Sequence, residues 1–232
     1  MSSSRNPGRV AGLVYLLLLF APLRLIYIPS ALFVTGNPTA TAANIAAHET
    51  LFRLGILSDL FTGTAVIFVT LAFYRLFKGV DKHLAALVVI LGSLMVTPIY
   101  FMNVLNDAAA LMLARGADFL TPFDASQRSA LAMLFLRLHH YGVVANEVFW
   151  GLWLLPLGIL AYRSHFLPRF LGVWLVINAF AYLAMSFTGV MLPQYEDTVG
   201  NVVLPAQLGE LAMMLWLVIR GAKAEALTPA PV

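Results

Sequence analysis

Six long apolar runs constrain the fold of this chain more than any other feature of its sequence. A helix rises about 1.5 Å per residue and the hydrocarbon core of a bilayer is about 30 Å thick, so about 20 apolar residues cross a membrane. The runs fall at about residues 10–34, 51–77, 84–114, 129–162, 170–192 and 199–219. The sequence therefore predicts an all-α integral membrane protein, a bundle of six transmembrane helices.

The composition agrees with this class and excludes several kinds of site. Hydrophobic residues make up 61% and charged residues 11% of the 232 residues, whereas soluble domains carry about 25% charged residues. The chain has no cysteine, which excludes disulfides, zinc–thiolate sites and thiol nucleophiles. The formal net charge of +3 indicates no nucleic-acid partner, because the basic residues lie where cytoplasmic loops are expected.

The distribution of arginine and lysine predicts the orientation in the membrane. Basic residues precede the first run, separate the second from the third and the fourth from the fifth, and follow the sixth, whereas residues 36–48 carry none. The positive-inside rule then places both termini in the cytoplasm. Only the connection between the third and fourth runs is ambiguous, because it carries both arginine and aspartate. We expect one transmembrane domain over residues 1–232, with residues 221–232 as a short cytoplasmic tail.

The stretch of residues 139–151, HHYGVVANEVFWG, places ionisable side chains inside the fourth run. Insertion scales give a cost of about 2.5–3.5 kcal/mol for a charged residue at the centre of a membrane helix, so such residues are functional candidates. On a helix, His140 and Glu147 share one face, with Arg137 one turn earlier. The adjacent stripe consists of His139, Asn146 and Trp153.

Other runs place polar residues at comparable depths. Measured from the cytoplasmic ends of the runs, the following residues lie in the outer half or near the midplane: Arg24, Asp59, Asn103, Asn106, Asp107, Asn178, Tyr182 and Glu210. We therefore expect a shared polar cavity that opens toward the outer side. The carboxylates of Asp59, Asp107, Glu147 and Glu210 outnumber Arg24 and Arg137, whereas Glu49 and Arg53 satisfy each other at spacing i, i+4. Two carboxylates must then be protonated, pair with a histidinium or bind a cation.

Several interpretations of these residues stay open. Asn178 and Tyr182 are typical of hydrogen bonds that hold membrane helices together, and Arg24 could form a structural pair with Asp59 or Glu210. A single divalent metal is a second interpretation, with His140, Glu147 and Asp107 as ligands of a suitable type for zinc or iron. No H-x-x-x-H or H-E-x-x-H motif supports it. The cofactor prediction is therefore none or one divalent metal.

General acid–base chemistry on a lipophilic small molecule is the third interpretation. Its catalytic candidates are Glu147, His140, Asp107 and Glu210, because carboxyl and imidazole groups in an apolar site exchange protons. The substrate-binding candidates are Arg24, Arg137, Asp59, Asn103, Asn106, His139, Asn146, Asn178 and Tyr182. A non-catalytic lipid- or ligand-binding protein is an alternative. A proton-coupled carrier is another, although the cytoplasmic half lacks the polar lining that alternating access needs.

Four stretches together resemble a known family. They are ANIAAHETLFRLGILSDL (residues 43–60), LHHYG (138–142), VFWGLWLLPLGILAYRSHFLPRFLGVWLVI (148–177) and GELAMMLWLVIRG (209–221). Together they resemble the bacterial multi-pass membrane proteins of the domain of unknown function DUF4386, and the likeness covers nearly the whole chain. The resemblance implies a helical protein of the bacterial cytoplasmic (inner) membrane and assigns no substrate, cofactor or catalytic residue. The expected partners are membrane lipids and a lipophilic small molecule, and a homodimer is an option.

Overall fold

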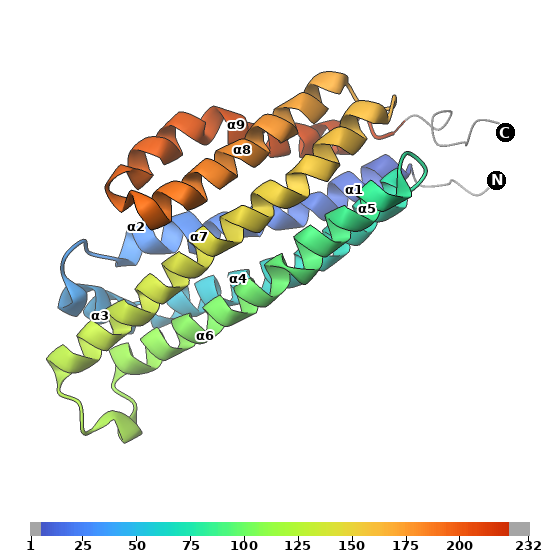
Figure 1. The fold of residues 1–232 in the computed structure, drawn as a ribbon. Helices are drawn as coiled ribbons and strands as arrows, with labels where there is room; N and C mark the ends of the chain where they lie inside the picture. Colours follow the sequence, from blue (N-terminus) through green and yellow to red (C-terminus); the bar gives the residue numbers. More distant parts are fainter. Residues whose placement is uncertain (1–5, 223–232) are drawn as a thin grey trace. The chain divides into compact units, whose positions relative to one another are not determined.

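The computed structural model of this protein describes residues 6–222, and all of their regular structure is helical (Figure 1). The predicted tail at residues 221–232 therefore lies outside the described residues from position 223 onward. The α-helices are α1 (Pro7–Tyr15), α2 (Ile28–Leu32), α3 (Pro38–Ala47), α4 (Glu49–Phe77), α5 (Lys82–Val89), α6 (Val96–Arg115), α7 (Ala125–Arg163), α8 (Arg169–Met191) and α9 (Glu196–Ile219). Short 3₁₀ or π-helical turns are η1 (Leu16–Phe20), η2 (Leu23–Tyr27), η3 (Ile90–Leu94), η4 (Asp118–Leu120) and η5 (Pro193–Tyr195).

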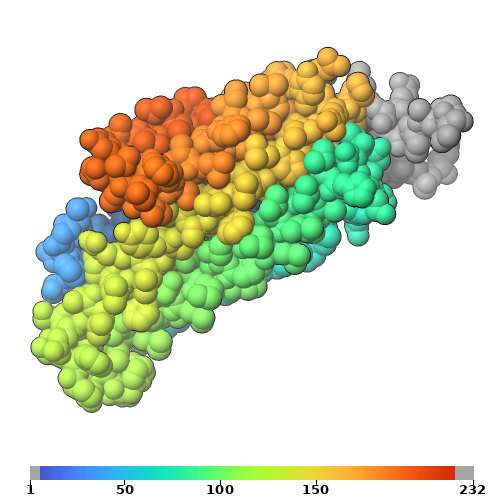
Figure 2. Space-filling model, in the orientation of Figure 1, coloured from blue at the N-terminus to red at the C-terminus, as the bar shows by residue number. Residues whose placement is uncertain are grey.

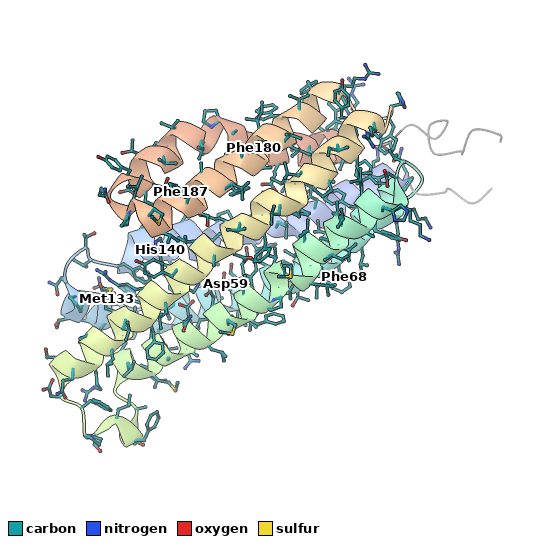
Figure 3. The ribbon with its side chains drawn as sticks, in the orientation of Figure 1. Asp59, Phe68, Met133, His140, Phe180 and Phe187 are labelled. Atoms are coloured by element: carbon teal, nitrogen blue, oxygen red, sulfur yellow. The ribbon has the colours of Figure 1, made fainter. Side chains whose placement is uncertain are left out.

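Six helical segments among the described residues are long and apolar enough to cross a membrane, which confirms the number that the sequence predicts. They are Pro7–Leu32, Glu49–Phe77, Lys82–Arg115, Ala125–Arg163, Arg169–Met191 and Pro193–Ile219. Their surfaces are also apolar: Phe68 is 57% exposed, and Phe180 and Phe187 on α8 are each 61% exposed (Figure 3). Figure 2 displays an exposed face of α8, in orange, and part of α9. Large apolar side chains at the surface are suited to contact with lipid.

The first segment is not a regular α-helix, because prolines interrupt its hydrogen bonds. Pro22 and Pro29 lack the N–H that an α-helix requires. Between them the chain forms the π-helical turn η2, in which the N–H of Ile28 donates to the carbonyl of Leu23. A π turn of this kind often marks a functional site. Here it carries Arg24, whose side chain is only 2% exposed.

The connection of residues 36–48 folds into the additional helix α3. Asn37 caps it, since its Oδ1 accepts a hydrogen bond from the N–H of Ala40 at 2.9 Å, and Pro38 occupies the first helical position. These are typical signals for a helix start. A second start signal precedes α7, where Asp124 and Gln127 each accept a hydrogen bond from the backbone N–H of the other, at 2.8 and 2.9 Å. This reciprocal capping box fixes the beginning of α7.

The chain divides into two compact units, each described by itself below. The first unit comprises residues 6–18, Ala65–Thr97 and 144–222, and the second comprises Leu19–Thr64 and Pro98–Val143.

The core of the first unit surrounds Tyr15, Phe73 and Trp153, with Tyr15 and Phe73 edge to face at a centroid distance of 4.9 Å. Close backbone contacts between helices support this core. A Cβ atom on Gly172 of α8 would lie 2.6 Å from the carbonyl oxygen of Gly158 on α7, so only glycine fits. Small residues at such crossings are typical of membrane helix packing.

In the second unit, α4, α6 and α7 also pack closely. A Cβ atom on Gly63 of α4 would lie 2.8 Å from the Cβ of Tyr100 on α6. Gly142 of α7 leaves space for the amide of Asn103 on α6, which a Cβ at position 142 would overlap. These crossings leave room for polar side chains between the helices.

Candidate functional site

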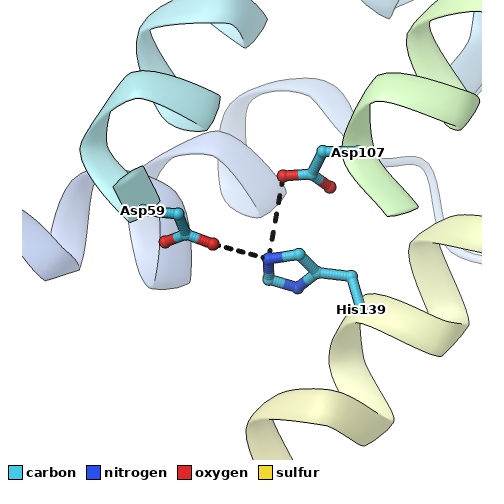
Figure 4. Close-up of side chains that lie close together, drawn as sticks. All are labelled: Asp59, Asp107 and His139. Carbon is cyan, nitrogen blue, oxygen red and sulfur yellow. Dashed lines mark hydrogen bonds and ion pairs between the residues drawn. The ribbon is translucent and has the colours of Figure 1, made fainter. Parts of the chain in front are cut away.

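Four ionisable side chains from four separate elements meet in the interior of the second unit. Arg24 comes from η2, Asp59 from α4, Asp107 from α6 and His139 from α7. Their exposed fractions are 2%, 0%, 0% and 2% respectively. We call these four residues the Arg–Asp–His–Asp cluster; Figure 4 shows Asp59, Asp107 and His139 facing one another.

Arg24 and Asp107 form a bidentate ion pair. The Nε and Nη2 atoms of Arg24 donate to the two carboxylate oxygens of Asp107, each at 2.6 Å. Such fork-to-fork geometry is the strongest arrangement for an arginine and a carboxylate. The guanidinium also lies 5.9 Å from the ring centroid of Phe52, and Gly55 leaves room for the Arg24 side chain. The ion pair is therefore held from several sides.

His139 lies between the two aspartates. Its Nε2 atom is 2.9 Å from Oδ2 of Asp59, which is a hydrogen bond, and 3.7 Å from Oδ2 of Asp107 (Figure 4). The imidazole thus contacts one carboxylate directly and lies close to the second. This contact joins the ion pair to Asp59.

The charges of this cluster do not balance when the imidazole is neutral. Two aspartates and one arginine then sum to a charge of −1 in a buried place, where an uncompensated charge is costly. One additional positive charge brings the sum to zero.

Two polar atoms beside the cluster lack a hydrogen-bond partner among the described residues. They are Oδ1 of Asp59 and Oγ1 of Thr62, three residues later on α4. Both side chains are buried, at 0% and 1% exposure. Residues at this spacing lie on the same helix face. Both atoms are available to accept a hydrogen bond from a bound molecule.

Metal-ligand side chains gather at the same place. Ligand atoms of Asp59, Asp107 and His139 lie within 4.8 Å of one another, the one such group of three among residues 6–222. Of the predicted metal set of His140, Glu147 and Asp107, only Asp107 belongs to it. The assignment of a metal to His140 and Glu147 stays a prediction.

A second polar centre lies in the first unit, around Glu210 of α9. Tyr15 of α1 donates to its Oε2 at 2.7 Å. On α8, the Nδ2 of Asn178 and the hydroxyl of Tyr182 each donate to Oε1 at 3.0 Å. We call these four residues the Glu210 centre. It unites three predicted site residues with Tyr15.

The structure thus divides the four predicted catalytic residues between the units, with Asp107 and His140 in the second and Glu147 and Glu210 in the first. His140 has an exposed side chain, although its neighbour His139 is buried. Glu147 is buried, at 6% exposure. The joint action of the four residues stays a prediction.

The remaining predicted binding residues differ in burial. Asn103 and Asn146 are buried, at 2% and 1% exposure, and Oδ1 of Asn146 has no hydrogen-bond partner in the described part of the chain. Asn106 is half-buried and Arg137 is exposed. Of the predicted binding residues, Arg24, Asp59 and His139 belong to the Arg–Asp–His–Asp cluster, whereas Arg137 does not.

Tyr15 is the residue of these sites that the sequence analysis missed. A tyrosine in an apolar run is ordinary, since its ring packs in a core and only its hydroxyl needs a partner. No sequence signal favoured His139 over His140, because His139 and Asn146 have the same seven-residue spacing as His140 and Glu147.

These features define the class as a multi-pass helical membrane protein with a buried Asp–His–Asp group. The sequence model of one family, described as "Domain of unknown function (DUF4386)", matches residues 10–221. The chain therefore belongs to this family, as the resemblance predicts. Searches of curated proteins and of solved structures found no match.

Replacing Arg24 by glutamine tests the buried ion pair. We expect the free energy of unfolding to fall by about 3–5 kcal/mol, because Asp107 keeps its charge without its partner. The measurement is reversible unfolding in mixed micelles with increasing sodium dodecyl sulfate.

Arg53→Gln is the matched control. The Nε of Arg53 lies 2.7 Å from Oε1 of Glu49, close to the 2.6 Å of the Arg24–Asp107 pair. However, Arg53 is 54% exposed and Glu49 also contacts Arg115. We expect a loss below about 1 kcal/mol. Equal losses for the two variants would contradict the structural role of Arg24.

Proposed function

We propose that this protein binds a lipophilic small molecule within the membrane and exchanges one proton with it at the Arg–Asp–His–Asp cluster. The observation that carries this proposal is the 2.9 Å contact between His139 and Asp59 beside the Arg24–Asp107 ion pair. A histidine and a carboxylate in direct contact are the usual components of general acid–base catalysis. His139 takes the role that the sequence analysis gave to His140.

A proton fits this cluster better than a divalent metal ion. Both oxygens of Asp107 already accept hydrogen bonds from Arg24 at 2.6 Å, so a metal ligated by Asp107 would have to displace the guanidinium. A divalent ion would also change the charge sum from −1 to +1 and would lie close to the arginine. One proton brings the sum to zero without either cost.

The surroundings of the cluster support a lipophilic ligand with a polar group. The unpaired Asp59 Oδ1 and Thr62 Oγ1 atoms would accept hydrogen bonds from a hydroxyl or amine of the ligand. The exposed apolar faces of the helices would allow such a molecule to approach from the lipid. In this proposal Arg24 is the charge partner of Asp107, and exposed Arg137 is free to serve an anionic head group.

A proton-coupled carrier is the second candidate. The Glu210 centre favours it, because a half-buried carboxylate in the other unit would give the chain a second intramembrane group able to bind a proton or a cation. Intramembrane carboxylates and histidines are typical of such carriers. A non-catalytic lipid- or ligand-binding protein would use the same cluster without converting the bound molecule.

We further propose a location in the bacterial cytoplasmic membrane with both termini inside, and a homodimer as one arrangement. The support is the basic character of the connections after α4 and α7.

The orientation can be tested by cysteine labelling, because the chain has no cysteine and a single one can be introduced. In intact cells, an impermeant maleimide should label Phe119→Cys and leave Gly79→Cys unlabelled until the cells are lysed. The reverse pattern would contradict the orientation.

Three proteins test the proposed function: wild type, His139→Gln and His140→Gln. Each is purified and incubated with a bacterial polar-lipid extract, and retained and converted molecules are identified by mass spectrometry. The wild type should retain or convert a specific molecule. His139→Gln should slow any conversion by about 100-fold or more, the lower end of a typical acid–base contribution, and should reduce retention. His140→Gln should retain it, whereas the sequence-based prediction expects a loss.

The outcomes separate the candidates. A new product indicates an enzyme, and an unchanged retained molecule indicates a binder. A carrier is indicated if the wild type neither retains nor converts a molecule but takes one up into vesicles. This uptake must depend on a proton gradient and fail in His139→Gln. Wild-type behaviour of His139→Gln in all three assays would contradict the proposal.

A further inference from the structure

We propose that the Glu210 centre is a separate binding site for an organic ammonium ion, the protonated form of a lipophilic amine. This site lies in the first unit and uses none of the residues of the Arg–Asp–His–Asp cluster. The inference is therefore independent of the proposed proton exchange at His139.

The first support is the electrostatic state of Glu210. Tyr15, Tyr182 and Asn178 all donate hydrogen bonds to its carboxylate, an arrangement suited to an ionised acceptor. Among residues 6–222 no lysine, arginine or histidine lies within ion-pair distance of it. The donors fix the position of the carboxylate, but they bring no positive charge. In this proposal a bound cation supplies that charge.

The second support is an unused acceptor beside the carboxylate. Asn178 is 0% exposed, and its Nδ2 atom donates to Glu210, whereas its Oδ1 atom has no hydrogen-bond partner among the described residues. A buried acceptor without a donor is costly. An ammonium group offers several N–H donors, so it would satisfy both the carboxylate and this amide oxygen.

The third support is the aromatic environment, which favours an organic cation over a hydrated metal ion. Tyr15 packs against Trp153 at a centroid distance of 6.3 Å, and Tyr182 packs against Trp150 at 5.5 Å. Surroundings rich in aromatic residues suit an organic ammonium ion better than a hard metal ion, which requires several oxygen ligands. Tyr182 and Glu210 are only partly buried, so the centre is accessible from outside the unit.

Calorimetric titration of the whole protein in phosphatidylcholine nanodiscs tests this inference. Three ligands of equal chain length are compared: hexylamine, which is cationic at pH 7, uncharged hexan-1-ol and anionic hexanoate. Empty nanodiscs give the background from partition into lipid. We expect saturable binding with one site per chain for hexylamine, and background heats for the other two ligands.

Two variants locate the site. Glu210→Gln should weaken hexylamine binding by about tenfold or more, because a hydrogen bond to a charged group is lost. Asp197→Asn on the same helix removes one negative charge at an exposed position and should bind as the wild type does. Both variants leave His139 in place, so their results do not depend on the proposed function.

Three results would overturn the inference. The first is that the wild type shows no hexylamine heat beyond that of empty nanodiscs. The second is that the wild type binds hexan-1-ol and hexylamine equally. The third is that Glu210→Gln binds hexylamine as the wild type does. The first two use only the wild type, so the test remains decisive if Glu210→Gln fails to fold.

Discussion

The bidentate ion pair between Arg24 and Asp107 is the interaction on which the interior of the second unit depends. A charge inside an apolar helix bundle is tolerated only where a partner is in contact with it. Arg24 compensates one of two aspartates, and His139 contacts the other at 2.9 Å. The cluster is thereby left one positive charge short of neutrality when the imidazole is neutral. This shortfall connects the fold to its proposed chemistry, in which one proton supplies the missing positive charge.

Local departures from regular helix structure create the space for these side chains. Pro22 and Pro29 flank the π-helical turn that carries Arg24, and Gly55 on α4 leaves room for the Arg24 side chain. In the first unit, Gly158 and Gly172 bring α7 and α8 into backbone contact. Asn178 and Tyr182 on α8 reach Glu210 of α9. Prolines and glycines thus determine how closely the helices approach one another around the polar side chains.

The sequence predicted the architecture well because span length and hydropathy are local properties. The six spans, the family and the i, i+4 contact of Glu49 with Arg53 are confirmed. The partners of the buried charges were not predictable, because contacts between helices depend on their relative rotation and register. Arg24 pairs with Asp107 rather than with the suggested Asp59 or Glu210. The seven-residue spacing of His139 and Asn146 did not distinguish them from His140 and Glu147, and nothing local distinguished Tyr15 from an ordinary core tyrosine.

A double-mutant cycle between Arg24→Gln and His139→Gln tests most directly whether the four side chains act as one cluster. Both residues contact Asp107 but belong to η2 and α7, so no local effect links them. The free energy of unfolding is measured for the wild type, both single variants and the double variant under identical micelle conditions. The account predicts a coupling energy above about 1 kcal/mol, because each substitution changes the charge that the other must balance. Additivity within about 0.5 kcal/mol would contradict it and would leave two unrelated buried pairs.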